Sequence, residues 1–368
     1  MTSKTYHIDV VTLQNFMVDV FKACGVPAED AQLASEVLIT SDLRGIESHG
    51  IGRLKYYYDR IKTGQHQVLT QFEVVRESPT TAVADGHHGM GMVIGVRAMQ
   101  MAIDKARQYG MGSVAVRNST HFGIDGYYPL MAVKEGMIGM SFTNARPAVA
   151  PTFGVQPMLG TNPIAFGCPT DEPFPFLFDA ATPIIQRGKI EIAQREEVQI
   201  KEGLVIDQNC QPMTDPTLIL KGFDQGTAAF LPVGGVGETF GGHKGYGLGV
   251  MVEIFSSALQ NGAFLYGLTG FDEHHQRQPF KVGHFFMAIH IECFTSLDEF
   301  KKTVGTILRQ LRASRKAPGQ SRIYTAGEKE YESEQRVRAE GVPVIPNLQK
   351  EIKFLQQELG LNQYTFPF

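Results

Sequence analysis

The chain has 368 residues, of which 43% are hydrophobic and 20% charged, and its formal net charge is -4. This composition is typical of a globular protein with a substantial core, and the small negative charge gives no electrostatic reason to expect nucleic acid or an anionic membrane as a partner. The four cysteines are far apart and form no C-x-x-C pair, which argues against a zinc site and favours a reducing compartment. The sequence has no apolar run of membrane-spanning length and no signal-peptide core, so we expect a cytoplasmic protein.

The first sixty residues have the apolar periodicity of helices. Apolar residues recur every three or four positions from Leu13 to Phe21, and the pattern restarts from Leu33 to Leu38. A third helix is predicted from about residue 51 to residue 62, because Gly64 suits the position just after a helix end.

From about residue 68 to residue 228 the pattern changes to short apolar runs separated by glycine, proline and asparagine, which is typical of β-strands. Helical patterns interrupt these strands at 93–109 and 127–134. A further helix follows "GGHKG" and is predicted to end at Asn261-Gly262, with Leu248 and Val252 among the residues of its apolar side. The predicted strands are the runs "TTAVAD", "GSVAVRN", "MIGMSFTN", "PIAFGCP" and "FPFLFDAAT".

The C-terminal part returns to helix. The run "SLDE" from Ser296 to Glu299 is a capping box, and a last helix is predicted from about residue 348 to residue 359. The pattern therefore predicts an α/β (α+β) fold in which residues 1–75 and 298–368 form one helical domain and residues 76–297 form a second domain. The helix after the capping box is expected to bury Phe300, Val304, Ile307, Leu308 and Leu311.

The run "GMGMVIG", with glycines at 89, 91 and 95, resembles a dinucleotide-binding turn. A Rossmann turn directly follows a strand and has an acidic residue near a second strand about 20 positions later. Here "DGHH" separates the glycines from the strand, and Asp104 falls within a predicted helix. We therefore interpret these glycines as positions of close packing between a helix and the sheet.

A second glycine-rich run, "GGVGETFGGHKGYGLG", lacks the G-K-[ST] ending of a P-loop. Its glycines still leave backbone amides accessible, Lys244 adds a positive charge, and a helix begins at once. This turn is the best candidate for an anion site in the chain; the alternative is a tight turn with a solvated lysine.

Two segments carry residues suited to acid–base chemistry. Arg44 precedes His49 by five positions, and this pair could recognise a carboxylate and exchange a proton; the alternative is a surface arginine beside a capping histidine. His121 follows a predicted strand in a polar cluster that begins at Asn118, where α/β proteins often collect reactive groups; the alternative is a loop histidine with structural hydrogen bonds. The remaining histidines have no metal-binding spacing, so no metal is expected.

Taken together, eight segments resemble the malate/L-lactate dehydrogenase family that lacks a Rossmann fold. Its relatives include ureidoglycolate dehydrogenase, sulfolactate dehydrogenase and diketogulonate reductase. The matching segments extend in order from residue 41 to about residue 344: "SDLRGIESHGIGRL", "VRNSTHFGIDGYY", "GMIGMSFTNARPAVAPTFG", "LGTNPIAFGCP", "FLFDAAT", "RGKI", "GGHKGYGL" and "GEKEYESEQRVRAEGVPV".

This resemblance implies that residues 76–297 form a non-Rossmann, mixed-sheet NAD(P)-binding domain. It also implies hydride transfer between a nicotinamide cofactor, NAD with NADP as the alternative, and a small 2-hydroxy or 2-oxo acid. Malate/oxaloacetate is the expected pair and L-lactate/pyruvate the alternative. The residues that the resemblance assigns to the cofactor are Ser141, Phe178, Asp179, Ala180, Ala181, Thr182, His243, Lys244, Ala326, Gly327 and Glu328.

By the same resemblance, His49 or His121 transfers the proton, Arg44 and Asn118 bind the substrate, and Asp179 orients a histidine or the cofactor amide. The family also implies a homodimer. Two other functions fit the same residues: an imine reductase acting on a cyclic amino-acid precursor, and a non-catalytic NADH-binding protein.

Overall fold

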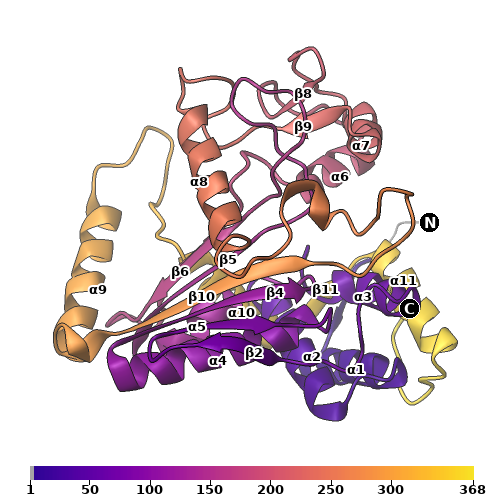
Figure 1. Ribbon diagram of the computed structural model, residues 1–368. Coiled ribbons are helices and arrows are strands. Elements are labelled where there is room, and N and C mark those ends of the chain that lie inside the picture. The colour runs from indigo at the N-terminus through magenta and orange to yellow at the C-terminus, as the bar shows by residue number, and fades with distance from the viewer. Residues whose placement is uncertain (1–3) are drawn as a thin grey trace.

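The computed structural model describes residues 4–368. Its centre is a seven-stranded mixed sheet with the strand order β2-β3-β4-β10-β5-β6-β7, in which only β3 and β4 are parallel neighbours (Figure 1). A Rossmann sheet is built mostly of parallel strands, so the structure confirms the expected non-Rossmann, mixed α/β fold. The strands are β2 (Glu73–Glu77), β3 (Thr81–Asp85), β4 (Met111–Ser119), β5 (Met137–Thr143), β6 (Ile164–Cys168), β7 (Phe176–Ala180) and β10 (Val282–His290).

The helices α4 (Gly91–Tyr109) and α5 (Tyr127–Lys134) pack against the sheet, and α4 makes the crossover between the parallel strands. A Cβ on Gly91 would lie 2.2 Å from the carbonyl oxygen of Thr120, and one on Gly95 would lie 2.5 Å from the ring of Tyr128. These distances are too short for a side chain, which confirms that "GMGMVIG" permits close packing.

Helices from both ends of the chain lie side by side below the sheet in the view of Figure 1. The first strand and the last are paired antiparallel, α10 contacts α2, and α11 contacts α3. One continuous hydrophobic core joins these helices to α4 and to β3 and β4. The division into two domains stays a prediction. The elements of this layer are β1 (Tyr6–Ile8), α1 (Val10–Ala23), α2 (Ala28–Leu43), η1 (Ile51–Arg53), α3 (Leu54–Lys62), α10 (Glu328–Glu340), β11 (Val342–Val344) and α11 (Pro346–Glu358).

A smaller lobe lies on the other side of the sheet and has its own hydrophobic cluster around Ile190, Ile219 and Phe230 (Figure 1). It contains two helices, α6 and α7, that were not predicted within the strand-rich part of the chain. The second begins with Asp215, whose carboxylate accepts hydrogen bonds from Thr217 N and Leu218 N at 2.8 and 3.1 Å, a start signal that the strand-rich surroundings obscured. The elements of the lobe are α6 (Arg187–Arg195), β8 (Val205–Asp207), α7 (Pro216–Gln225), β9 (Ala228–Phe230), α8 (Gly242–Phe255) and η2 (Leu265–Leu268).

Two predicted apolar faces are corrected. Helix α8 ends at Phe255 instead of Asn261, and Leu248 is 44% exposed, because the residues it buries are mainly glycines, with Val252 and Glu253. Helix α9 (Leu297–Ala313) begins with the expected capping box, in which Ser296 Oγ accepts from Glu299 N at 3.3 Å. Of its five predicted core residues only Leu308 is buried. The helix lies at the outer edge of the sheet, after η3 (Ile291–Cys293), where one face stays open (Figure 1).

Within residues 4–368, no helix combines the length and the apolar character that crossing a membrane requires.

Candidate active site

The loop between α2 and η1 carries His49. His49 N donates to the carbonyl oxygen of Ile46 at 3.0 Å, and its ring Nδ1 lies 2.8 Å from Ser48 Oγ. The ring is half-buried. These contacts fix both the backbone and the ring of His49.

His121 lies just beyond the end of β4. Its Nδ1 is 2.6 Å from the hydroxyl of Tyr57 and 3.3 Å from the backbone N–H of Gly123. Its ring stacks on that of His49, with 5.6 Å between centroids and 23° between planes. The structure therefore brings together the two histidines that the sequence offered as separate candidates, from segments 72 residues apart.

Burial controls the charge of both rings. It lowers the pKa of His49 to about 4, and the positive charge of Arg53 adds to the effect. It lowers the pKa of His121 well below its usual value, with further contributions from His49 and Arg53. Both rings are therefore neutral near pH 7, and each can accept a proton from a substrate hydroxyl.

A third histidine, His66, is fully enclosed beside this pair. It is 2% exposed, neither ring nitrogen has a hydrogen-bond partner within residues 4–368, and burial lowers its pKa to about 3. Its folded-state pKa thus lies below the value of about 6.5 expected in the unfolded chain. The unfolded chain binds the extra proton first, so stability is complete above about pH 6.5 and is lost as the pH falls toward 3.

Replacing His66 with leucine is expected to remove this acid sensitivity. Between its folded and unfolded pKa values, one such histidine lowers the free energy of unfolding by about 1.4 kcal/mol for each unit that the pH falls. From pH 7 to pH 5, the free energy of unfolding of the variant should therefore fall by about 2 kcal/mol less than that of the wild type. Urea unfolding at the two pH values measures the difference. His274→Leu, at an exposed position, is the control. Equal losses in His66→Leu and the wild type would contradict a buried, neutral His66.

Arg53 and Tyr57 are site residues that the sequence reasoning missed. Arg53 Nε donates to the carbonyl oxygen of Ser48 at 2.7 Å, and its charge lowers the pKa of both His49 and His121. A signal was present: Arg53 and Tyr57 lie four residues apart in the predicted helix from about residue 51 to residue 62, which places both side chains on one face, and Arg53 follows His49 by four positions.

A group of arginines adjoins the histidines. Burial lowers the pKa of Arg146, and the charges of Arg60, Arg187 and Arg53 lower it further, while Tyr56 acts in the opposite direction. Arg146 is nevertheless exposed to solvent. These four arginines come from α3, η1, α6 and the segment after β5. A position that is surrounded by protein and cations yet open to solvent is suited to binding an anion.

Arg44 lies in a different cluster. It is 6% exposed at the end of α2, and Nε and Nη2 have no hydrogen-bond partner in the described chain. Burial lowers its pKa, while the negative charges of Glu330, Glu334 and Asp179 raise it. Arg53, and not Arg44, is the arginine whose charge reaches both imidazoles. The expected role of Arg44 as a substrate clamp stays a prediction.

The side chain of Asn118 is held by Asp85. Its Nδ2 donates to Asp85 Oδ2 at 2.9 Å, and the same oxygen accepts from Arg117 Nε at 2.8 Å. The backbone of Asn118 has φ 51°, a left-handed conformation that asparagine tolerates. This amide supports the end of β4, and substrate binding by Asn118 stays a prediction.

Ser141 and Asp179 meet at a pair of carboxyl groups. Ser141 Oγ donates to Asp125 Oδ1 at 2.5 Å, and Gly126 N donates to Asp179 Oδ2 at 2.7 Å. Burial, and then the charge of Asp179, raises the pKa of Asp125 well above its usual range; burial raises the pKa of Asp179 to about 6. Asp125 Oδ2 is buried without a partner in residues 4–368. No motif in the sequence marks Asp125.

The segments predicted to hold a cofactor lie close together at the end of β7. Leu177 N donates to the carbonyl oxygen of Ala326 at 3.3 Å, which places Ala326 beside the run from Phe178 to Thr182. Gly327 has φ 92°, and a Cβ there would lie 2.6 Å from the carbonyl oxygen of Pro175. Only glycine fits this approach.

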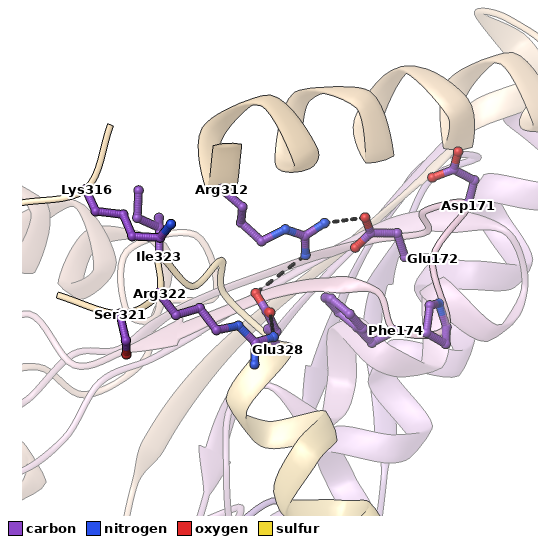
Figure 2. Close-up of a pocket in the computed structure, with 10 residues that line it drawn as sticks. Asp171, Glu172, Phe174, Arg312, Lys316, Ser321, Arg322, Ile323 and Glu328 are labelled. Carbon is purple, nitrogen blue, oxygen red and sulfur yellow. Dashed lines mark hydrogen bonds and ion pairs between the residues drawn. The ribbon is translucent and has the colours of Figure 1, made fainter. Parts of the chain in front are cut away.

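Glu328 is largely neutralised. Its carboxylate pairs with Arg312 at 3.5 Å and with Arg322, and it is 3% exposed (Figure 2). Arg312 also pairs with Glu172, so these ion pairs line a pocket of about 660 Å³ between α9 and α10 (Figure 2). The carboxylate of Glu328 therefore anchors the start of α10, and direct contact with a cofactor stays a prediction.

The first turn of α8 presents His243 and Lys244 to solvent. The helix follows Gly241, which has φ 86°. It lies beside the segment from Phe178 to Thr182, because a Cβ on Gly249 would lie 3.3 Å from Thr182 Oγ1. A helix N-terminus carries partial positive charge, and the lysine adds a full one. The predicted anion site and the β7 run thus belong to neighbouring elements.

Comparisons with known proteins agree with this arrangement. The malate/L-lactate dehydrogenase family model matches residues 8–353. The chain is 43% identical to a malate dehydrogenase of Pyrococcus abyssi, over 95% of this chain and 94% of that protein. It is 39% identical to an L-sulfolactate dehydrogenase of Methanocaldococcus jannaschii, over 95% and 96% respectively. The crystal structure of malate dehydrogenase from Entamoeba histolytica superposes with a TM-score of 0.95 at 45% identity, covering 99% of this chain and 100% of that one.

The family match, the mixed sheet and the paired histidines all support the same assignment. The chain belongs to the malate/L-lactate dehydrogenase family and is a 2-hydroxy acid dehydrogenase that works with a nicotinamide cofactor.

Proposed function

We propose that the protein interconverts malate and oxaloacetate with NAD(H). The observation that carries this proposal is that Arg53, bonded to the carbonyl oxygen of Ser48 next to His49, has a charge that acts on both histidines and on Arg146. A dicarboxylic acid has two anionic ends, and an arginine can bind each of them in a bidentate manner. Lactate has one such end and would leave one cation group unused.

In the proposed oxidation, Nε2 of His121 accepts the proton of the substrate hydroxyl, while Nδ1 faces Tyr57. For Nε2 to accept a proton, the neutral ring must carry its hydrogen on Nδ1, so Nδ1 donates to the Tyr57 hydroxyl oxygen both before and after the transfer. In the reverse direction the protonated ring returns its proton to the carbonyl oxygen. His49 packs against His121 and lowers its pKa, which favours the neutral, proton-accepting form.

Arg53 and Arg146 are proposed to hold the two carboxylates. Fixing both ends orients the carbon that reacts, which reduces the entropy cost of reaching the transition state. Arg53 is anchored by its bond to the carbonyl oxygen of Ser48, in the loop that carries His49. The segment from Ser48 to Arg53 thereby connects the proposed carboxylate-binding arginine to His49, which packs against the proton-accepting His121.

The residues around β7 and α8 fit a dinucleotide. Asp125 Oδ2 is an unpaired buried oxygen that an amide could satisfy, and the first turn of α8 offers Lys244 and a helix N-terminus to phosphates. When bound, the nicotinamide accepts a hydride from the substrate carbon or donates one to it. We propose that Asp179 and Ser141 orient the amide end and that His243 and Lys244 hold the phosphates. The preference for NAD(H) over NADP(H) is tested by comparing kcat/KM for the two reduced cofactors.

Substrate choice provides the test of this proposal. Following NADH absorbance, we expect oxaloacetate to be reduced with a higher kcat/KM than pyruvate. Arg146→Met should lower kcat/KM for oxaloacetate by about 10²-fold while changing that for pyruvate little, because a charged pair with the second carboxylate is lost. Arg315→Met, at an exposed position, is the control. Equal losses for both acids, or better turnover of a cyclic imine, would count against a dicarboxylate substrate.

We also propose a cytoplasmic homodimer. The open face of α9 carries Ile307 and Leu311, each more than half exposed, and a second copy could cover it. Light scattering of the purified protein measures the mass, and a monomer at micromolar concentration would contradict the proposal.

A further inference from the structure

Asp42 is a buried carboxyl group that takes no direct part in the proposed reaction. It lies in the last turn of α2, is 2% exposed, and makes no ion pair within residues 4–368. A buried carboxyl without a cation is costly unless hydrogen bonds or protonation compensate. Its presence therefore calls for a reason.

The contacts of Asp42 are with the loop that carries His49. Ile51 N donates to Asp42 Oδ2 at 2.8 Å, in a buried bond just beyond the histidine. A Cβ on Gly50 would lie 1.9 Å from Asp42 Oδ1, so the Gly50 backbone lies directly against the carboxyl group. The C-terminal end of the loop is thereby fixed two residues from His49.

The other end of the loop is fixed by the neighbouring residue. Ser41 Oγ donates to the carbonyl oxygen of Ile46 at 2.8 Å, and the same carbonyl oxygen accepts from His49 N at 3.0 Å. Consecutive residues of α2 thus hold both ends of the segment from Ile46 to Ile51. His49 lies between the two attachments, with its ring against His121.

We propose that Asp42 is a positioning residue that sets the place of His49, and through it the stacked histidine pair. The inference rests on the proposed function only in treating that pair as the site of proton transfer. Burial raises the pKa of Asp42 to about 8, so near pH 7 it acts mainly as a neutral acceptor for Ile51 N. Asparagine should therefore replace it, whereas alanine should not.

The test compares Asp42→Ala with Asp42→Asn and with a matched control, Asp30→Ala. Asp30 lies on the same helix, is 4% exposed, and pairs with Arg97 at 2.6 Å, away from the His49 loop. Side-chain ¹H–¹⁵N correlation spectra of the histidines report the surroundings of His49 without turnover, with the signal assigned by His49→Gln. Thermal unfolding separates global destabilisation from local displacement.

We expect Asp42→Ala to shift the His49 signal and to lower kcat by up to about 10-fold, because a displaced His49 no longer holds the His121 ring in place. Asp42→Asn should restore both. Asp30→Ala should lower Tm and leave the His49 signal in place. The proposal is overturned if Asp42→Ala resembles Asp30→Ala in both signal and kcat. Should the wild type fail to reduce any 2-oxo acid, the proposed function falls, while the His49 signal still decides the role of Asp42.

A second variant keeps the test decisive if Asp42→Ala does not fold. Gly50→Ala retains the carboxyl group and pushes the loop away from it, because the new Cβ would overlap Asp42 Oδ1. The same shift of the His49 signal and the same loss of kcat are expected. An unchanged signal with unchanged kcat in Gly50→Ala would overturn the proposal.

Discussion

Replacing His121 with glutamine is expected to lower kcat for oxaloacetate reduction by about 10³-fold, within the range that a positioned acid–base group contributes. Glutamine keeps a polar side chain at this position but cannot carry the proton. The KM for NADH should change little, because the loss concerns the chemical step. Steady-state kinetics in both directions measure the effect.

His49→Gln and His274→Gln complete this experiment. His49 stacks on His121 without the Tyr57 contact, so a smaller loss of about 10-fold is expected from altered packing and pKa. His274 is 77% exposed, and its replacement should change nothing. If His49→Gln abolished turnover while His121→Gln remained active, His49 would be the proton-transfer residue.

Replacing Arg53 with methionine is expected to lower kcat/KM for oxaloacetate by about 10²- to 10³-fold, the loss typical of removing one partner from a buried charged pair. The acid limb of the pH profile should also move. Malate oxidation requires a neutral imidazole, so kcat/KM falls as the pH drops through the pKa of the accepting histidine. The charge of Arg53 lowers the pKa of both rings, so in Arg53→Met this limb should move to higher pH.

Arg44→Met provides the contrast for Arg53. Arg44 lies beside Asp179 and Glu330, so its loss should affect stability and cofactor affinity more than the affinity for oxaloacetate. NADH fluorescence titration and substrate kinetics separate the two effects. A larger loss of kcat/KM for oxaloacetate in Arg44→Met, with an unshifted pH profile in Arg53→Met, would restore Arg44 as the substrate clamp.

Most of the sheet was predictable because its strands are short apolar runs bounded by glycine and proline. All five predicted runs coincide with β3, β4, β5, β6 and β7. The helices α6 and α7 were missed because they are only 9 and 10 residues long, so the apolar pattern repeats too few times; Asp215, Pro216 and Gly226 mark the two ends of α7. The exposure of α9 could not be predicted, because the apolar periodicity of a helix is the same whether its apolar face packs against the core of the same chain or against another molecule.

The two histidines of the site were predictable as candidates, but their partners were not. The sequence reasoning paired His49 with Arg44, five residues before it, and passed over Arg53, four residues after it, whose charge acts on both rings in the structure. Arg146 lies 93 residues from Arg53, and only the folded chain brings their charges into the same region. Asp125 depends on Ser141 and Asp179, each on a different strand, so no local pattern marks it.

A crystal structure with NADH and tartronate, a 2-hydroxy dicarboxylic acid, is the most direct test of whether the histidine–arginine cluster is the substrate site. We predict the tartronate hydroxyl within hydrogen-bond distance of His121 Nε2, one carboxylate on Arg53 and the other on Arg146. Tartronate bound at Arg44, or bound anywhere with both imidazoles turned away from its hydroxyl, would contradict that assignment.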